Sequence, residues 1–196
     1  MKDELTVSSS KMLPSRNVKH PLHLAVADTI ERRGIGAAIL YRDLAADDSP
    51  RQRLPLFLGK RRSSCTRLCN VDLLVIKDDA VKVIIEIEES DFRPTIICGK
   101  FLTSVLATHF IHDSCHNSEP IQVSDSALFV QVVNTSKLPK DTKKPFQYKL
   151  LKSELQSLLP RLSSHVELYK LFCVEGENDI PALGKVGNAV ALACNA

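Results

Sequence analysis

Three carboxylates stand at one end of a predicted β-hairpin in the middle of the chain. Two runs rich in Val and Ile within residues 71–89 flank the turn-prone segment 77–80, and this pattern predicts two antiparallel strands joined by a tight turn. Glu86 and Glu88 are two residues apart, so they share one face of the second strand. A turn centred in this segment places Asp72 opposite Glu86, with their Cβ atoms about 5 Å apart.

These three side chains indicate a cation-binding site. Carboxylates held so close repel one another and are costly to desolvate, so a positive charge should compensate them. Mg²⁺ or Mn²⁺ suits a ligand set made only of oxygen atoms. The other interpretation is a solvated acidic edge at the end of a surface hairpin, without a ligand. The apolar run that leads to the acids, which includes Val83, Ile84 and Ile85, favours the cation site.

The flanking helices supply two further candidates. Pro21 begins a predicted helix that ends at Arg33, before Gly34. Glu31 lies about one turn from the buried stripe of this helix, where it is either a further carboxylate near the metal or a solvated helix acid. Lys100 lies in the first turns of the helix that follows the hairpin, close to where the acids end.

The other predicted elements alternate around the hairpin. Because a helix connects the second hairpin strand to the next strand, those two strands should be parallel. The order predicts an α/β fold with a mixed central β-sheet flanked by helices on both faces. Short strands are expected within 37–41 and 54–58, a buried strand at 127–133 after a loop at 116–126, a helix at 145–159 and a last strand at 166–174.

Basic residues gather in two stretches. Residues 51–67 hold six basic side chains and no acid, with Ser and Thr among them, and residues 137–152 hold six lysines and one aspartate before Glu154. Arg and Lys with hydroxyl side chains are typical of phosphate contacts, although a charge run is also a common solvated face. The candidates for binding nucleic acid are Lys60, Arg61, Arg62, Arg67, Lys140, Lys143 and Lys144.

Length and composition fit one folded domain. The chain has 196 residues, 44% of them hydrophobic, and a net charge of +3, which is too small to indicate a nucleic-acid partner without the clustering of the charges. We expect a flexible arm at 1–19, a domain at 20–175 and a C-terminal tail at 176–196. No run approaches the roughly 18 apolar residues of a membrane span, so we expect a soluble cytoplasmic protein.

An α-β-β-β-α-β order with Asp on one hairpin strand and Glu-x-Glu on the next resembles the PD-(D/E)xK nuclease superfamily, over roughly residues 20–175. The resemblance implies a restriction endonuclease-like core and a metal-dependent DNA endonuclease of the restriction or repair type. It also implies Asp72, Glu86 and the main-chain carbonyl of Ile87 as ligands of Mg²⁺.

The third position of the motif is Glu88, where the superfamily usually has Lys. In one interpretation Glu88 is a metal ligand or the general base for the attacking water, and in another Lys100 supplies the missing positive charge. A third is an inactive site. The alternatives to an enzyme are a catalytically inactive nucleic-acid-binding module and a dimerisation module that uses the hairpin edge. A homodimer is compatible with both the enzyme and the module.

Overall fold

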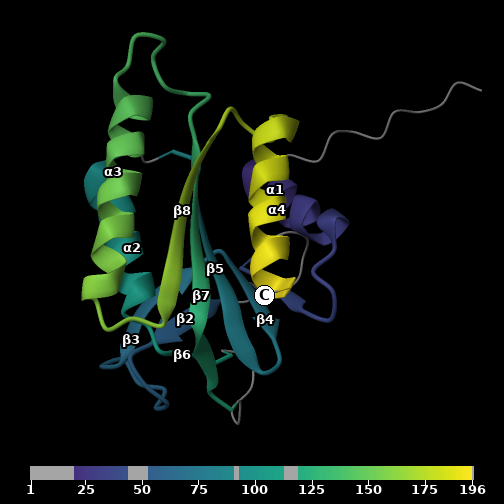
Figure 1. The fold of residues 1–196 in the computed structure, drawn as a ribbon, viewed down its shortest axis with the longest axis vertical. Helices are drawn as coiled ribbons and strands as arrows, with labels where there is room; N and C mark the ends of the chain where they lie inside the picture. Colours follow the sequence, from purple (N-terminus) through teal and green to yellow (C-terminus); the bar gives the residue numbers. More distant parts are fainter. Residues whose placement is uncertain (1–19, 44–52, 91–92, 113–118, 196) are drawn as a thin grey trace, which may run out of the picture.

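The computed structural model describes residues 20–43, 53–90, 93–112 and 119–195, so the predicted arm at 1–19 lies outside the described residues. Within them, one open, mixed sheet of eight strands lies between two pairs of helices, as predicted: α2 and α3 on one side, α1 and α4 on the other (Figure 1). The strands are β1 (Ile39–Arg42), β2 (Leu54–Phe57), β3 (Arg67–Val71), β4 (Leu73–Lys77), β5 (Ala80–Glu88), β6 (His109–Phe110), β7 (Ile121–Asn134) and β8 (Val166–Val174). The helices are α1 (Pro21–Arg33), α2 (Pro94–Val105), α3 (Lys144–Leu158), the 3₁₀ turn η1 (Leu159–Arg161) and α4 (Ile180–Asn195).

The hairpin forms as predicted. Leu73 pairs with Ile85 in an antiparallel ladder, and Asp78 and Asp79 have φ angles of 52° and 55°. Two successive residues with positive φ are the signature of a type I′ turn, whose twist matches that of the strands it joins. The hairpin offers no free edge, however, because β4 also pairs with β1 and β5 also pairs with β7. A dimerisation module, one of the alternatives, would therefore have to use a surface other than the hairpin edge.

The longest strand, β7, organises the sheet. Its C-terminal part pairs in parallel with β5 on one side and with β8 on the other, as the helical connections α2 and α3 require. Its first residues pair with β6, which leads on to β2 and β3. The sequence pattern missed three of these features: β3 as a separate strand, the two-residue β6, and the start of β7 at Ile121, which lies in the predicted loop.

Alternating side chains of the sheet build two cores. Ile84 and Phe129 face α2 and α3, where they pack in one apolar cluster with Phe101 and Tyr148. The residues that alternate with these along each strand, such as Ile85, face α1 and α4 and pack in the second cluster. Because side chains alternate along a strand, Glu86 and Glu88 belong to the face of Ile84, which is covered by α2.

The C-terminal residues differ from the prediction of a tail at 176–196. Residues Ile180–Asn195 form α4, and Leu183, Val186 and Val190 are buried in the second core. Helix α4 lies beside α1 (Figure 1). Gly187 permits this approach, because a Cβ atom there would lie 2.9 Å from Arg33 Cγ. The glycines of α4 thus belong to a contact surface between two helices.

Candidate metal and phosphate site

Asp72 sits where the chain changes partners in the sheet. It separates β3, which pairs with β2, from β4, which pairs with β5 and β1. Its main chain stays in the sheet, since its N–H donates to the carbonyl of Ile85 at 3.2 Å and its carbonyl accepts from Asp43 N–H at 2.8 Å. Its Oδ2 accepts from the N–H of Ile87 at 2.7 Å. This bend therefore holds the Asp72 carboxylate against the end of β5.

Glu86 and Glu88 meet a cation from α2. Lys100 Nζ lies 2.9 Å from Glu86 Oε2 and 2.6 Å from Glu88 Oε1. The two carboxylate side chains are only 1% and 8% exposed, whereas that of Lys100 is 32% exposed. The structure thus brings together the residues of the predicted site, and the nearby positive charge comes from α2, at the position that the sequence indicated.

Of the two interpretations of Glu31, the structure supports the solvated helix acid and not a further carboxylate of the site. Glu31 is half-exposed and pairs with Arg42, eight residues or about 12 Å along α1 from the residue that does contact the site carboxylates. The residue that reaches them is His23, whose Nε2 lies 3.3 Å from Asp72 Oδ1 and whose Nδ1 lies 3.0 Å from Glu89 Oε1. The only signal in the sequence is the position of His23 beside Leu22, at the edge of the apolar stripe.

Burial and charges within the site shift the pKa values of Glu86 and Asp72 in opposite directions. Burial raises the pKa of Glu86 well above its ordinary value, with Lys100 opposing and Asp72 reinforcing this shift. Burial also works to raise the pKa of Asp72, but the hydrogen bond and charge of His23, together with the charge of Lys100, outweigh it and the pKa is lowered. Two neighbouring carboxyl groups with opposite pKa shifts are typical of functional sites.

The two cations respond to neighbouring acids, and Asp72 acts on both. Burial acts to lower the pKa of Lys100, but Glu86 and Asp72 overcome it and the pKa is raised. The pKa of His23 is likewise raised, because Asp72 and Glu89 outweigh its burial. The neighbouring carboxylates therefore favour the charged form of both groups.

The donor set suits a hard divalent cation. Glu86 Oε1 is buried and meets no hydrogen-bond donor among the residues that the structure describes, so this oxygen is available to an ion. Asp72 and Glu88 would add further carboxylate oxygens, and oxygen ligands are those that Mg²⁺ and Mn²⁺ prefer. Ile87 gives its N–H to Asp72, and its carbonyl as a ligand stays a prediction.

Gln131 and Tyr169 form a buried polar pair in the sheet next to the site. Gln131 lies next to Glu86 in the β5–β7 register. Its Nε2 donates to the carbonyl of Ile97 at 3.1 Å, and its Oε1 accepts from the hydroxyl of Tyr169 at 2.7 Å. Gln131 thereby ties the first turns of α2, which carry Lys100, to the centre of the sheet. The sequence analysis missed this residue, which appears only as a polar interruption in an apolar strand.

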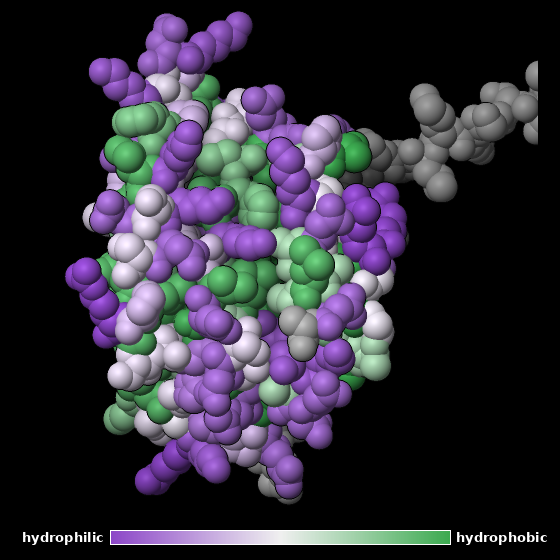
Figure 2. Space-filling model, viewed as in Figure 1, coloured by the Kyte–Doolittle hydropathy of each residue, from purple (hydrophilic) through white to green (hydrophobic). Residues whose placement is uncertain are grey.

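The basic stretches lie at opposite ends of the sheet. Residues 137–144 follow the carboxyl end of β7, where β5 also ends, and this loop is at the top of the molecule (Figure 1). Hydrophilic side chains project from that end of the surface (Figure 2). The loop with Lys60, Arg61 and Arg62 follows β2, which joins the sheet beside the start of β7 through β6. Arg67 begins β3 and contacts Asn70. The two stretches therefore do not form one continuous patch.

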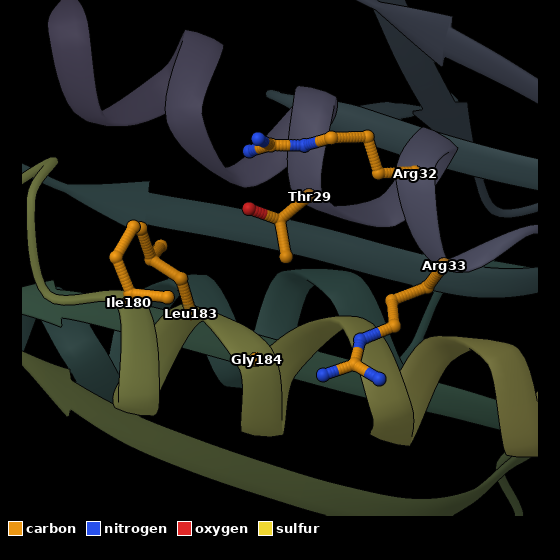
Figure 3. A pocket seen from close by; sticks show the side chains of 6 residues that line it. All are labelled: Thr29, Arg32, Arg33, Ile180, Leu183 and Gly184. Atoms are coloured by element: carbon orange, nitrogen blue, oxygen red, sulfur yellow. The ribbon is translucent and has the colours of Figure 1, made fainter.

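A cleft of about 290 Å³ lies away from the carboxylates, between α1 and α4 (Figure 3). Thr29, Arg32 and Arg33 line it from the second half of α1, whereas His23 is in the first turn of that helix. None of the helices in the described ranges has the length and apolar character needed to cross a membrane.

Comparison of the chain with protein-family models, with curated proteins and with solved structures gives no match. Function is therefore inferred from the chemistry of the site.

Proposed function

We propose that this protein is a metal-dependent nuclease that hydrolyses phosphodiester bonds in DNA. The observation that carries the proposal is the gathering of Asp72, Glu86, Glu88 and Lys100 at the end of one hairpin. The resemblance to the PD-(D/E)xK superfamily, with its restriction endonuclease-like core, draws support from the mixed sheet and from the order α1, β1, β4, β5, α2, β7, to which β2, β3 and β6 are additional.

Each residue has a role in this proposal. Asp72, Glu86 and Glu88 would hold Mg²⁺ or Mn²⁺, which supplies a bound water of lowered pKa and stabilises the charge on the phosphate. Asp72 is already oriented by His23 and by the N–H of Ile87. Lys100 is the cation that can turn from the carboxylates to the scissile phosphate, because its flexible side chain is partly exposed.

Cleavage of plasmid DNA with Mg²⁺ or Mn²⁺ tests the proposal. We expect the wild-type protein to nick the plasmid and Glu86→Ala to be inactive, since removal of a metal ligand removes the ion. Glu31→Ala is the matched control. It also removes a carboxylate, but Glu31 lies in the last part of α1 and pairs with Arg42 of β1. This variant should cleave like the wild type. Equal nicking by wild type and Glu86→Ala would refute the catalytic assignment.

A non-catalytic nucleic-acid-binding module is the second candidate. It is favoured by Lys100, whose ammonium group already compensates Glu86 and Glu88 without a metal ion. Such a module would bind DNA with salt-dependent affinity but would show no cleavage and no Mg²⁺ binding. Calorimetric titration of Mg²⁺ into the wild type and Asp72→Asn separates the two candidates. A nuclease should bind Mg²⁺ and should bind it more weakly after the substitution, whereas the module should bind Mg²⁺ in neither form.

A further inference from the structure

A second group of potential metal ligands lies beside the carboxylate site. It consists of His20, His23 and Glu89, whose ligand atoms all lie within 4.8 Å of one another. His23 Nδ1 is 3.0 Å from Glu89 Oε1, and His20 Nδ1 is 3.8 Å from Glu89 Oε2. Two imidazoles and a carboxylate are ligands that Zn²⁺ accepts, whereas Mg²⁺ prefers oxygen alone.

Local structure explains why these residues converge. Pro21 is the first residue of α1 and His20 is its N-terminal flanking residue, so His20 and His23 are three positions apart on one side of the first turn. Glu89 directly follows β5 and reaches the same turn, where its Oε1 also accepts the N–H of Leu22 at 3.1 Å. The helix start and the strand end are thus fixed to one another at this point.

The second ring nitrogen of His23, Nε2, has the kind of carboxylate partner that metal-bound histidines have. Metal-bound histidines commonly donate their second ring N–H to a carboxylate, which fixes the tautomer and the orientation of the ring. His23 Nε2 faces Asp72 Oδ1 at 3.3 Å, and Asp72 is itself fixed by the N–H of Ile87. The His23 side chain is only 11% exposed. Its Nδ1 is therefore aimed at Glu89 by contacts on the far side of the ring.

We propose that His20 Nδ1, His23 Nδ1 and one carboxylate oxygen of Glu89 bind a Zn²⁺ ion. Zn–ligand bonds of about 2.0–2.2 Å require the three atoms to approach one another slightly, and the His20 side chain, which is 60% exposed, has the freedom to do so. Because His20 is exposed, water can supply a fourth ligand. Asp72 then connects the two cation sites, since it orients His23 and belongs to the carboxylate group.

The rival explanation is purely structural. Glu89 caps α1 through the N–H of Leu22 and pairs with His23, which is reason enough for both residues to be there. His20 distinguishes the two explanations, because its side chain makes no capping hydrogen bond. Its contacts with the group are an edge contact with the His23 ring and the 3.8 Å approach to Glu89. Loss of His20 should therefore impair zinc binding without weakening the helix.

Calorimetric titration of Zn²⁺ into the chelator-treated full chain, with Mg²⁺ in large excess, tests the proposal. We expect the wild type to bind Zn²⁺ and His20→Ala to bind it at least tenfold more weakly, with the same melting temperature in chelator. His165→Ala is the matched control, because His165 pairs with Asp125 at the start of β8, and it should bind like the wild type. With Co²⁺ in place of Zn²⁺, the visible absorption of a His-ligated ion should appear in the wild type and control only.

Absence of Zn²⁺ binding in the wild type, or equal affinity in the wild type and His20→Ala, would overturn the site and leave the helix cap as its explanation. The measurement involves no DNA and no cleavage. The zinc proposal can therefore fail while the nuclease proposal stands, and the reverse holds as well.

Discussion

At the scale of single residues, Lys100 holds the candidate site together. Its ammonium group contacts two carboxylates that are almost fully buried, and a buried charge without a partner is strongly destabilising. The apolar surroundings that make these acids useful to a metal ion also make them costly to the fold. A cation that binds here therefore replaces Lys100 as the counter-charge of Glu86 and Glu88.

Replacing Lys100 by Met should lower the free energy of unfolding by about 3 kcal/mol at pH 7.5, because Glu86 and Glu88 lose their counter-charge. Denaturation by urea measures this loss. Adding Glu86→Gln to the Lys100→Met variant should recover part of it, since one buried charge is then gone. Mg²⁺ should also stabilise Lys100→Met more than the wild type. A double variant as unstable as the sum of both single variants would contradict the coupling.

His23 should make stability depend on pH above about 6.5. Because Asp72 and Glu89 raise the pKa of His23, its contribution is complete below the unfolded-state pKa of about 6.5 and is lost as the pH rises through the folded-state pKa. Urea denaturation in chelator between pH 6 and 9 should show that the free energy of unfolding of the wild type, relative to that of His23→Gln, decreases as the pH increases.

His109 provides a control of opposite sign for this experiment. Burial lowers the pKa of His109, so protonation of its ring opposes folding and its cost disappears as the pH rises through about 6.5. With the series extended down to pH 5, the stability of the wild type relative to His109→Gln should therefore increase as the pH rises to about 6.5, whereas its stability relative to His23→Gln should decrease above that pH. Profiles that change in the same direction for both variants would contradict the opposite signs of the two shifts.

At the scale of elements, local signals were sufficient for the hairpin. The paired Asp residues at 78 and 79 and the alternation that leads to Glu86 and Glu88 are features of consecutive residues. Lys100 was also within reach, because a helix that directly follows β5 must begin beside the acids. His23 and Glu89 were not, since their contact depends on how α1 docks against the end of β5, and no sequence spacing encodes that docking.

Helix α4 was missed for a related reason. Glycine lowers helix propensity and is common in loops, yet Gly184 and Gly187 are where α4 meets Arg33 and Thr29 of α1. The two-residue β6 has no periodicity to detect. Both elements owe their structure to packing, which a reading of local pattern cannot supply.

Two glycines should respond in opposite ways to replacement by Ala. A Cβ at Gly187 would lie 2.9 Å from Arg33 Cγ and 3.1 Å from Thr29 Cγ2, whereas one at Gly99 in α2 would meet nothing within 4 Å. Gly187→Ala should lower the free energy of unfolding by about 1–3 kcal/mol through overpacking. Gly99→Ala should raise it by about 0.5–1 kcal/mol through helix propensity. Thermal denaturation of both proteins measures the pair, and a stabilised Gly187→Ala would contradict the close approach of α4.

At the scale of the whole molecule, the sheet separates two chemical environments. The α2 and α3 face carries Glu86, Glu88 and Lys100, and the opposite face carries the α1–α4 layer with His23 at its edge. Asp72 reaches both groups because it lies at the bend between β3 and β4. The bend in the chain is thus the point at which the two helical layers meet the same set of carboxylates.

The two basic stretches should contribute unequally to DNA binding. Glu86 lies beside Gln131, about 10 Å from the carboxyl end of β7, whereas Gln122, near which β2 joins the sheet, pairs with Ala80, about 20 Å before Glu86 on β5. A duplex of about 8 base pairs centred on the carboxylates extends roughly 14 Å to either side. It reaches the loop that contains Lys140 but stops short of the loop that contains Lys60.

Fluorescence anisotropy without Mg²⁺, over a series of salt concentrations, measures this difference. Replacing Lys140, Lys143 and Lys144 together by Gln should weaken binding of the short duplex and reduce its salt slope by up to about 2.7, since each lost phosphate contact removes about 0.9. The matched replacement of Lys60, Arg61 and Arg62 should leave the short duplex unaffected and weaken only a duplex of about 20 base pairs. Equal effects of both triple variants on the short duplex would place the DNA elsewhere, because no duplex of that length centred on Glu86 spans both ends of β7.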